Sequence, residues 1–226
     1  SVILHIADSA CFVEDIGKGE LTMGKKRVGI FGGTFDPIHM GHLIVAETIM
    51  DEFHLDKVVF IPAAVPPHKL DKQISPAKHR YMMTMLATCS NPRFQVSDME
   101  MHRQGPSYSR DTLAQLIEEH GRDTEFYFIV GADSVETLHS WSRIDELLTM
   151  CHFIGASRPG CMPDMEKIAQ RFGPLVEKIH CLETPELEIS STEIRHRVGQ
   201  KRTIRYIVPE TVEQYIYKEK LYLDMV

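Results

Sequence analysis

The residues best placed to do chemistry are two histidines three positions apart, His39 and His42. A short β-rich run over 28–31 precedes them, and a helical pattern of apolar residues follows from Gly41. The segment is therefore predicted to be a strand, a tight loop and a helix, with both imidazoles at the start of the helix.

The predicted strand ends in Gly32 and Gly33, which let the backbone turn sharply and approach a ligand closely. The N–H groups and dipole of a helix N-terminus favour an anion. With two imidazole donors added, these parts predict a phosphate site. The alternative is an ordinary strand–helix turn with two incidental histidines in a chain that has 12.

Two later loops could also reach a ligand. His68 and Lys69 stand on a proline-stiffened loop after the second predicted strand, where they either bind a phosphate or are simply solvated. Ser107, Tyr108 and Ser109 precede a helix predicted to run to about residue 120. One of the serines is expected to cap that helix, which leaves the other hydroxyl and the N–H groups to meet a carboxylate or phosphate.

Asp133 follows the clearest predicted strand, a near-continuous apolar run over 125–130 that is typical of a parallel sheet. Its carboxylate could accept hydrogen bonds from a ribose, or it could cap the next helix. Trp141, the only tryptophan, stands eight residues later in a polar segment. It is either a lid over the core or a stacking surface for a flat ring.

A second helix start is predicted near Ser190, which together with Glu193 fits a plain capping box. Ser191, Thr192 and Arg195 add hydroxyls and a guanidinium at the same helix end. The segment therefore also predicts a second anion site.

Two other predicted helices suggest no function. One begins with Ser75 as N-cap and Pro76 at the first helical position, and its Arg80 is predicted to lie on the surface. The other runs from Pro209 to about Lys218 and shows no functional residue.

Strands and helices are predicted to alternate, with strands at 28–31, 57–61, 94–99, 125–130, 152–156 and 179–182. This alternation predicts an α/β fold, namely a doubly wound, Rossmann-like parallel sheet with helices on both faces. Ligands bind at the carboxyl ends of the strands in such folds. The two predicted anion sites can converge only if both lie at that edge.

The chain of 226 residues is long enough for one domain with a sizeable core. Its net charge of −7 argues against a nucleic-acid or anionic-membrane binder, and no apolar run approaches the ~18 residues of a membrane span. Five cysteines without a CxxC spacing indicate free thiols in a reducing cytoplasm.

The string GGTFDPIHMGH resembles the signature of the HxGH nucleotidyltransferases, which join a nucleoside triphosphate to a phosphorylated acceptor. It is neither the GxGxxG fingerprint nor a Walker loop. With PPHK, GPSYS, GAD, Trp141, SRPG and ISSTEIR following in order, the chain resembles the bacterial nicotinate-mononucleotide adenylyltransferase family from about Lys26 to Tyr222. Ser109 departs from the family's more usual threonine but keeps the hydroxyl.

The resemblance implies transfer of AMP from ATP to nicotinate mononucleotide, which gives deamido-NAD and pyrophosphate. It implies that His39, His42 and Arg195 are catalytic. The ATP-binding residues it implies are Gly32, Gly33, Thr34, Phe35, Gly41, Ser191 and Thr192. The residues it implies for nicotinate mononucleotide are Lys69, Tyr108, Ser109, Asp133 (on a ribose) and Trp141 (stacked on the pyridine ring).

The resemblance also implies Mg²⁺ carried on ATP, because magnesium prefers phosphates and water to protein cages, with no protein-only metal site. We expect a cytoplasmic monomer or homodimer with small-molecule substrates and no nucleic-acid or membrane partner. Residues 1–22 are expected to be an N-terminal extension or a cloning remnant, and residues 23–226 a single nucleotidyltransferase domain. Two alternatives stay open: a pantetheine-phosphate adenylyltransferase, and a non-catalytic nucleotide sensor.

Overall fold

The computed structural model describes residues 25–64, 74–103, 108–121, 123–157, 160, 162–185 and 187–224. The predicted extension 1–22 lies outside the described residues, and so do His68, Lys69 and Ser107.

The described strands form one six-stranded sheet. They are β1 (Lys26–Gly33), β2 (Lys57–Pro62), β3 (Phe94–Val96), β4 (Thr124–Gly131), β5 (His152–Ser157) and β6 (Ile179–Glu183). The α-helices are α1 (Met40–Glu52), α2 (Ala77–Thr88), α3 (Ser109–His120), α4 (Ala132–Glu136), α5 (Ile144–Met150), α6 (Met165–Phe172), α7 (Ser191–Gly199) and α8 (Glu210–Lys218). Short 3-10 helices are η2 (Met99–His102), η3 (Leu138–Ser140) and η4 (Gly173–Lys178).

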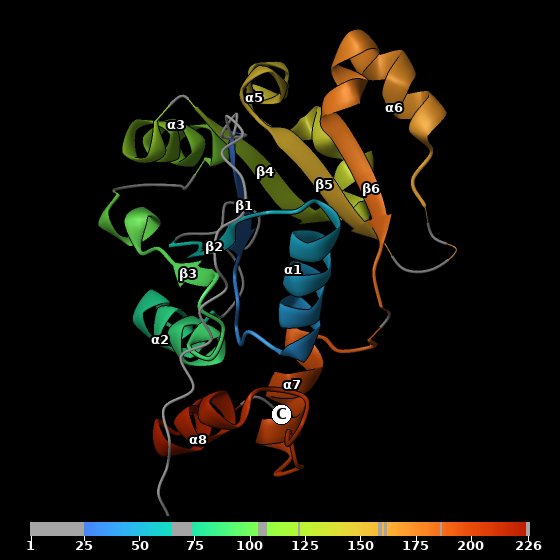
Figure 1. Ribbon diagram of the computed structural model, residues 1–226. Coiled ribbons are helices and arrows are strands. Elements are labelled where there is room, and N and C mark those ends of the chain that lie inside the picture. Colours follow the sequence, from blue (N-terminus) through green and yellow to red (C-terminus); the bar gives the residue numbers. More distant parts are fainter. Residues whose placement is uncertain are drawn as a thin grey trace, which may run out of the picture.

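The strand order is β3-β2-β1-β4-β5-β6, and each neighbouring pair is parallel. The chain therefore winds outward from β1 to one edge and then returns to wind from β4 to the other. This confirms the predicted doubly wound fold (Figure 1). The direction of winding changes between β1 and β4, and the crevice outside their carboxyl ends is where such folds bind ligands.

Strand β4 shows why the sheet is buried on both faces. Phe126, Phe128 and Val130 pack into one hydrophobic cluster, whereas Tyr127 and Ile129 pack into the other. Successive side chains of a strand point to opposite faces, so a continuous apolar run requires a helical layer on each side.

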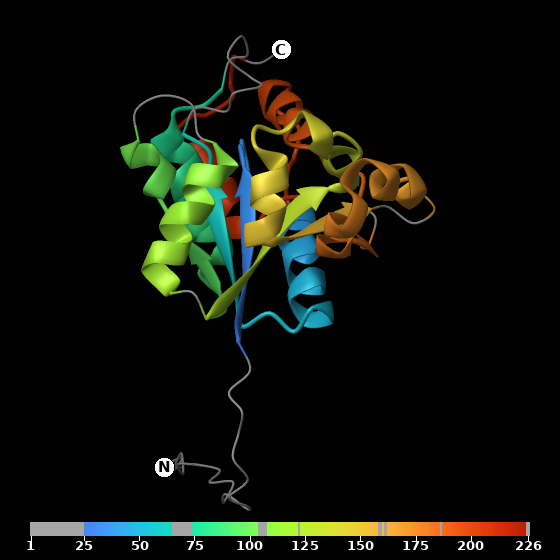
Figure 2. The ribbon, with the colours of Figure 1, turned by 90° about the horizontal axis from the view of Figure 1, so that it is seen from above.

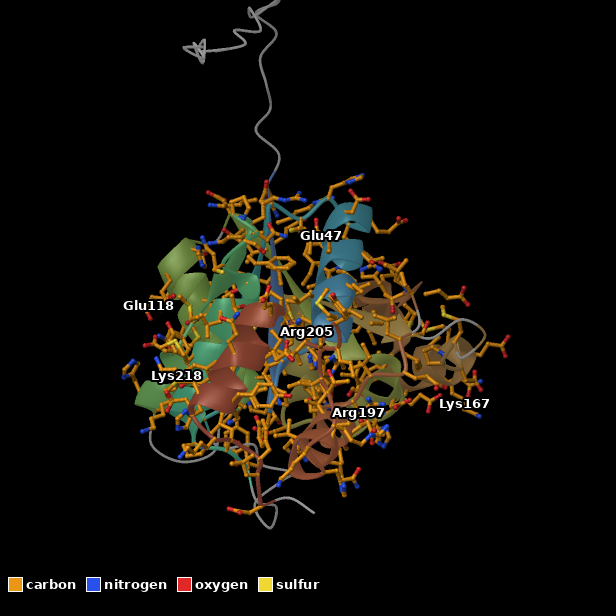
Figure 3. The ribbon with its side chains drawn as sticks, turned by 90° about the horizontal axis from the view of Figure 1, so that it is seen from below. Glu47, Glu118, Lys167, Arg197, Arg205 and Lys218 are labelled. Atoms are coloured by element: carbon orange, nitrogen blue, oxygen red, sulfur yellow. The ribbon has the colours of Figure 1, made fainter. Side chains whose placement is uncertain are left out.

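The two helical layers follow from these clusters. Helices α3 to α6 supply apolar side chains to the first cluster, and α1, α2, α7 and α8 supply them to the second. Figures 1 and 2 show the sheet between these layers. Exposed charged side chains of both signs cover the outer helical surfaces, among them Glu47 on α1, Lys167 on α6 and Lys218 on α8 (Figure 3).

Two predicted boundaries are wrong. The strand predicted over 94–99 ends at Val96, and a 3-10 helix follows from Met99. Helix α2 begins at Ala77, because Pro76 has a ψ of 139° and so serves as the N-cap in place of Ser75. No helix in the described ranges is long and apolar enough to cross a membrane.

Candidate active site

The turn after β1 is not made by the glycines, contrary to our prediction. Gly32 and Gly33 still belong to the strand, and the chain turns at Phe35, whose φ is 48°, and at the cis bond between Asp36 and Pro37. Gly33 is required for another reason. A Cβ atom there would lie 2.7 Å from the Phe35 ring, which is buried below this loop.

The two histidines lie together at the start of α1, as predicted. His39 is the N-cap, and its backbone N–H donates to Nδ1 of His42 over 3.2 Å. The neutral His42 ring therefore carries its proton on Nε2. The ring centroids are 3.7 Å apart. A Cβ atom on Gly41 would lie 3.1 Å from His39 Nδ1, so any other residue at this position would press against the His39 ring.

His39 is 7% exposed, and burial lowers its pKa to about 4. The ring is therefore neutral at pH 7, which avoids charge repulsion between the two adjacent rings. In the described residues, His39 Nδ1 and Arg195 Nε are the buried side-chain nitrogen or oxygen atoms without a hydrogen-bond partner. Buried polar atoms are seldom left unpaired, and these two lie where the sequence predicted anion contacts.

The two predicted anion sites converge. Ser191 Oγ donates to the carbonyl oxygen of Pro37 over 2.9 Å, and Arg195 Nη1 donates to that of Asp36 over 2.7 Å. The start of α7 is thus bound to the loop before α1, although more than 150 residues separate them in sequence. Arg195 Nη2 also donates to the Thr192 hydroxyl over 3.3 Å.

The predicted cap of α7 is also confirmed. The Ser190 side chain accepts the backbone N–H of Glu193 over 3.1 Å. The capping alternative and the anion-site interpretation therefore concern different residues, because Ser190 caps the helix while Ser191 and Arg195 reach the loop.

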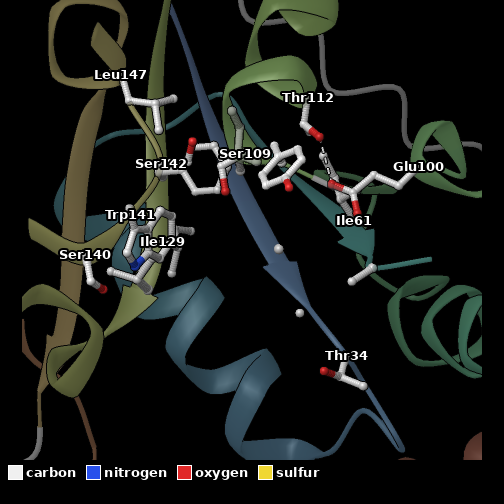
Figure 4. Close-up of a pocket in the computed structure, with 17 residues that line it drawn as sticks. Thr34, Ile61, Glu100, Ser109, Thr112, Ile129, Ser140, Trp141, Ser142 and Leu147 are labelled. Carbon is white, nitrogen blue, oxygen red and sulfur yellow. Dashed lines mark hydrogen bonds between the residues drawn. The ribbon is translucent and has the colours of Figure 1, made fainter. Parts of the chain in front are cut away.

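A cavity of about 390 Å³ opens beside the carboxyl ends of β1 and β4. Its lining includes Gly32, Gly33, Thr34, Glu100, Tyr108, Ser109, Thr112, Val130 and Trp141. In Figure 4, Trp141 lies on one side of β1 and the Glu100–Thr112 pair on the other. We call this the tryptophan cavity.

The structure confirms one of the two roles that the sequence left open for Trp141. Its ring meets Phe128 and Phe153 edge-on, with centroids 6.4 and 5.7 Å away, so it covers part of the core. It also lines the tryptophan cavity. Stacking on a pyridine ring stays a prediction.

The start of α3 also lines the tryptophan cavity. Tyr108 is its N-cap residue but makes no side-chain capping bond, and Ser109 is the first helical residue. The prediction of a serine cap is therefore wrong for Ser109. Sequence reasoning missed Glu100 and Thr112, whose side chains form a buried hydrogen bond of 2.7 Å in the cavity wall.

A second cavity of about 330 Å³ contains the histidines, and we call it the histidine cavity. Its lining includes Phe31, His39, Gly41, His42, Val130, Gly131, Ser157 and Ile189. Val130 lines both cavities. Both cavities therefore border the end of β4, next to the point where the winding direction changes.

Asp133 lines neither cavity. It is exposed in the first turn of α4, two residues beyond Gly131, which is the N-cap of that helix. The capping alternative for Asp133 is therefore wrong, and contact with a ribose stays a prediction.

Arg80 is not on the surface as predicted, because its side chain is 1% exposed. Its guanidinium donates to the carbonyl oxygens of Ser75, Thr34 and Ala64 over 2.9, 2.8 and 3.2 Å. Burial lowers its pKa, which the negative charge of Asp36 partly offsets. The helical period places residue 80 on the buried face with residues 83, 84 and 87, and this signal could have corrected the prediction.

Known proteins resemble this chain over most of its length. Residues 30–197 match the family model described as cytidylyltransferase-like. A protein of a Thermoanaerobacter species named probable nicotinate-nucleotide adenylyltransferase is 48% identical over 87% of this chain and 94% of its own length. A protein of Moorella thermoacetica with the same name is 48% identical over 87% and 91%.

Among solved structures, one titled Plasmodium falciparum nicotinic acid mononucleotide adenylyltransferase complexed with NaAD has a TM-score of 0.71 and 25% identity. The match covers 87% of this chain and 97% of that one. The fold and the paired histidines thus define a nucleotidyltransferase of the cytidylyltransferase-like class. Within that class, the chain belongs to the nicotinate-nucleotide adenylyltransferase family.

Proposed function

We infer that the chain transfers the adenylyl group of ATP to nicotinate mononucleotide, releasing pyrophosphate and forming deamido-NAD, a step of NAD biosynthesis. The observation that carries this inference is the pair of cavities at the carboxyl edge of the sheet, which both border Val130 and one of which contains His39 and His42. The relatives at 48% identity bear the corresponding name. A transferase needs two adjacent substrate sites, and a simple nucleotide sensor would need only one.

In this proposal ATP occupies the histidine cavity and nicotinate mononucleotide the tryptophan cavity. The 5′-phosphate of the mononucleotide attacks the α-phosphorus in line. A new P–O bond forms as the bond from the α-phosphorus to the pyrophosphate oxygen breaks, and no covalent enzyme intermediate is needed. Catalysis then consists of positioning and stabilisation of charge.

The described side chains suit these roles. Because His42 Nδ1 accepts a backbone N–H, its Nε2–H is the group that can donate to an α-phosphate oxygen. Ser191, Thr192 and Arg195 lie at the neighbouring helix start and would hold the β- and γ-phosphates. Tyr108 and Ser109, at the start of α3, would meet the nicotinate carboxylate.

We propose that magnesium arrives as part of the MgATP substrate. The described residues contain no group of three or more His, Cys, Asp or Glu side chains that could hold a metal ion. Phosphate oxygens and water would supply the ligands that magnesium prefers.

The test is to incubate the chain with MgATP and nicotinate mononucleotide, nicotinamide mononucleotide or phosphopantetheine, and to identify the products by mass. We expect deamido-NAD and pyrophosphate to form faster than any other product. Faster formation of NAD from nicotinamide mononucleotide would contradict the assigned substrate. If phosphopantetheine were the only acceptor to react with MgATP, the proposed reaction itself would be wrong.

We further propose that residues 23–226 act as one nucleotidyltransferase domain in the cytoplasm. The three cysteines in the described residues, Cys89, Cys151 and Cys181, are free thiols, which suits a reducing compartment. A chain that begins at Met23 should keep full turnover. If this shorter chain were inactive, the residues before Met23 would have a role in activity.

A further inference from the structure

The carboxylate of Asp36 lies buried in the middle of the loop that leads to the histidines, with 3% of the residue exposed. Its Oδ1 accepts the hydroxyl of Tyr222 over 2.7 Å, and its Oδ2 accepts the backbone N–H of Ser75 over 3.1 Å. Tyr222 comes from the end of the chain, 186 positions away. The last described turn of the protein is therefore bonded to the catalytic loop.

The backbone of that turn is shaped for this contact. Tyr222 has a φ of 65° and Lys220 a φ of 55°, values that side-chain-bearing residues seldom adopt. Such conformations persist only where the surroundings enforce them. The Tyr222 side chain is 6% exposed and packs in the core cluster below α8. Burial and the Asp36 carboxylate raise the pKa of its hydroxyl, so it stays a hydrogen-bond donor.

Arg80 binds the same loop at Thr34. Ser75 links the two contacts, because its N–H donates to Asp36 while its carbonyl accepts from Arg80 Nε. Arg80 Nη1 holds the carbonyl of Thr34, and Nη2 holds that of Ala64 after β2. We call Tyr222, Asp36, Ser75 and Arg80 the loop frame.

The loop frame fixes the direction of a backbone donor. In a trans peptide the C=O and the following N–H point in opposite directions, and the cis bond of this loop is at Asp36–Pro37. Because the Thr34 carbonyl faces Arg80, the N–H of Phe35 points away from Arg80. The frame thus sets the orientation of the peptide between Thr34 and Phe35, which precedes the histidines in the loop.

We propose that Tyr222 and Arg80 are positioning residues for adenylyl transfer, which hold the loop 34–39 so that its donors meet the α-phosphate. Neither residue needs to touch the substrate. The proposal rests on the proposed function, and it predicts that these residues affect turnover more than substrate binding.

The chain offers a matched pair of variants. Tyr222 and Tyr127 are both 6% exposed, and each donates its hydroxyl to a carboxylate, but Tyr127 bonds Glu125 near the amino end of β4. Tyr222→Phe should lower kcat about tenfold and leave both KM values within about threefold, because small displacements of catalytic groups cost rate. Tyr127→Phe should leave kcat within about twofold. A merely structural hydroxyl would lower the melting temperature without this difference in kcat.

Arg80→Lys provides the second measurement, since one ammonium cannot reproduce three fixed guanidinium contacts. It should also reduce kcat, and the double variant with Tyr222→Phe should lose less than the product of the two single losses, because both act on one loop. If Arg80→Lys does not fold, the Tyr222→Phe comparison decides alone. A kcat in Tyr222→Phe equal to that of Tyr127→Phe would overturn the proposal.

Amide NMR separates this result from the fate of the proposed function. Tyr222→Phe should shift the backbone amide signals of Thr34, Phe35 and His39, and Tyr127→Phe should not. Unmoved signals would overturn the loop frame. An inactive wild-type chain with shifted signals would instead contradict the proposed function and leave the frame supported.

Discussion

At the scale of single residues, His39 and His42 have different environments although they share one helix start. His39 is buried and neutral, and it supplies the backbone N–H that fixes the tautomer of His42. His42 presents the opposite nitrogen of its ring as a donor. A donor held in this way needs no reorganisation when charge develops on a phosphate oxygen, which is the condition for strong transition-state stabilisation.

His42→Ala should therefore lower kcat by on the order of 10²–10³ and change the apparent affinity for ATP much less. His102→Ala is a suitable control, because that ring is exposed and bonds the carboxylate of Asp98, away from the site. Steady-state rates with MgATP and nicotinate mononucleotide provide the measurement. If His42→Ala kept more than about a third of the wild-type kcat, His42 would not be the proposed transition-state donor.

Trp141 allows an optical test, because it is the only tryptophan. Nicotinate mononucleotide should quench its emission in a saturable way. Trp141→Ala should weaken the mononucleotide by about tenfold, with ATP affinity nearly unchanged, since stacking supplies ~0.5–1.5 kcal/mol beyond burial. The same variant should lower the melting temperature, because Phe128 and Phe153 lose an edge contact. A silent titration with a sharply lowered melting point would assign Trp141 to the core alone.

Sequence reasoning found the residues that carry an evident chemical group beside a strand end or a helix start. It failed for Arg80, because a charged residue is normally exposed and only its position on the buried helical face indicated otherwise. It failed for Glu100 and Thr112 because their contact depends on how η2 packs against α3, which no local pattern records.

At the scale of elements, the apolar runs predicted β4 and β5 within one residue, since each run is continuous and has clear ends. Strand β3 was overextended because an edge strand of three residues has little pattern to read. The turn after β1 was misassigned because paired glycines favour a turn locally, whereas tertiary packing of Phe35 decides where it occurs.

Helix caps give a prediction with an internal control. Ser190 caps α7 and Asp164 caps α6, each by accepting an N–H three residues later. Ser190→Ala and Asp164→Ala should each lower the free energy of unfolding by about 1 kcal/mol. Only Ser190→Ala should also reduce kcat/KM for MgATP, because α7 carries Ser191 and Arg195 to the loop. Equal effects of both variants on kcat/KM would show that the start of α7 has no part in the site.

At the scale of the whole molecule, the site is assembled from segments far apart in the chain. The loop before α1 is held by α2, by α7 and by the turn that contains Tyr222. The sequence showed nothing functional beyond residue 209, because a lone tyrosine near a chain end has no local signature. The protein also carries a net charge of −7, so an anionic substrate needs positive charge supplied locally, and Arg195 at the start of α7 supplies it beside the loop before α1.

At the amino ends of β5 and β6 lies a cluster of basic side chains that should influence stability in acid. Lys178 Nζ lies 3.0 Å from His152 Nε2, and His152 Nδ1 lies 2.9 Å from His180 Nε2. The Tyr127 ring stacks on the His152 ring. The charge of Glu125 raises the pKa of His152, and that of Arg27 lowers it. Burial first, and then the charge of Lys178, lower the pKa of both histidines, that of His152 to about 4.

These lowered pKa values make stability depend on pH in a definite direction. Between about pH 4 and 6.5 the unfolded chain binds more protons than the folded one, so the free energy of unfolding falls as the pH falls through this window. Melting temperatures measured from pH 7 to pH 4.5 should therefore decline.

The decline should be shallower in His152→Asn, which removes the ring but can keep a donor toward His180. It should not vanish, because His39 has a similarly lowered pKa. His54→Asn, at an exposed position whose φ of 50° suits asparagine, should follow the wild-type curve. If His152→Asn declined in parallel with the wild type, the histidine pair would not be a source of acid sensitivity.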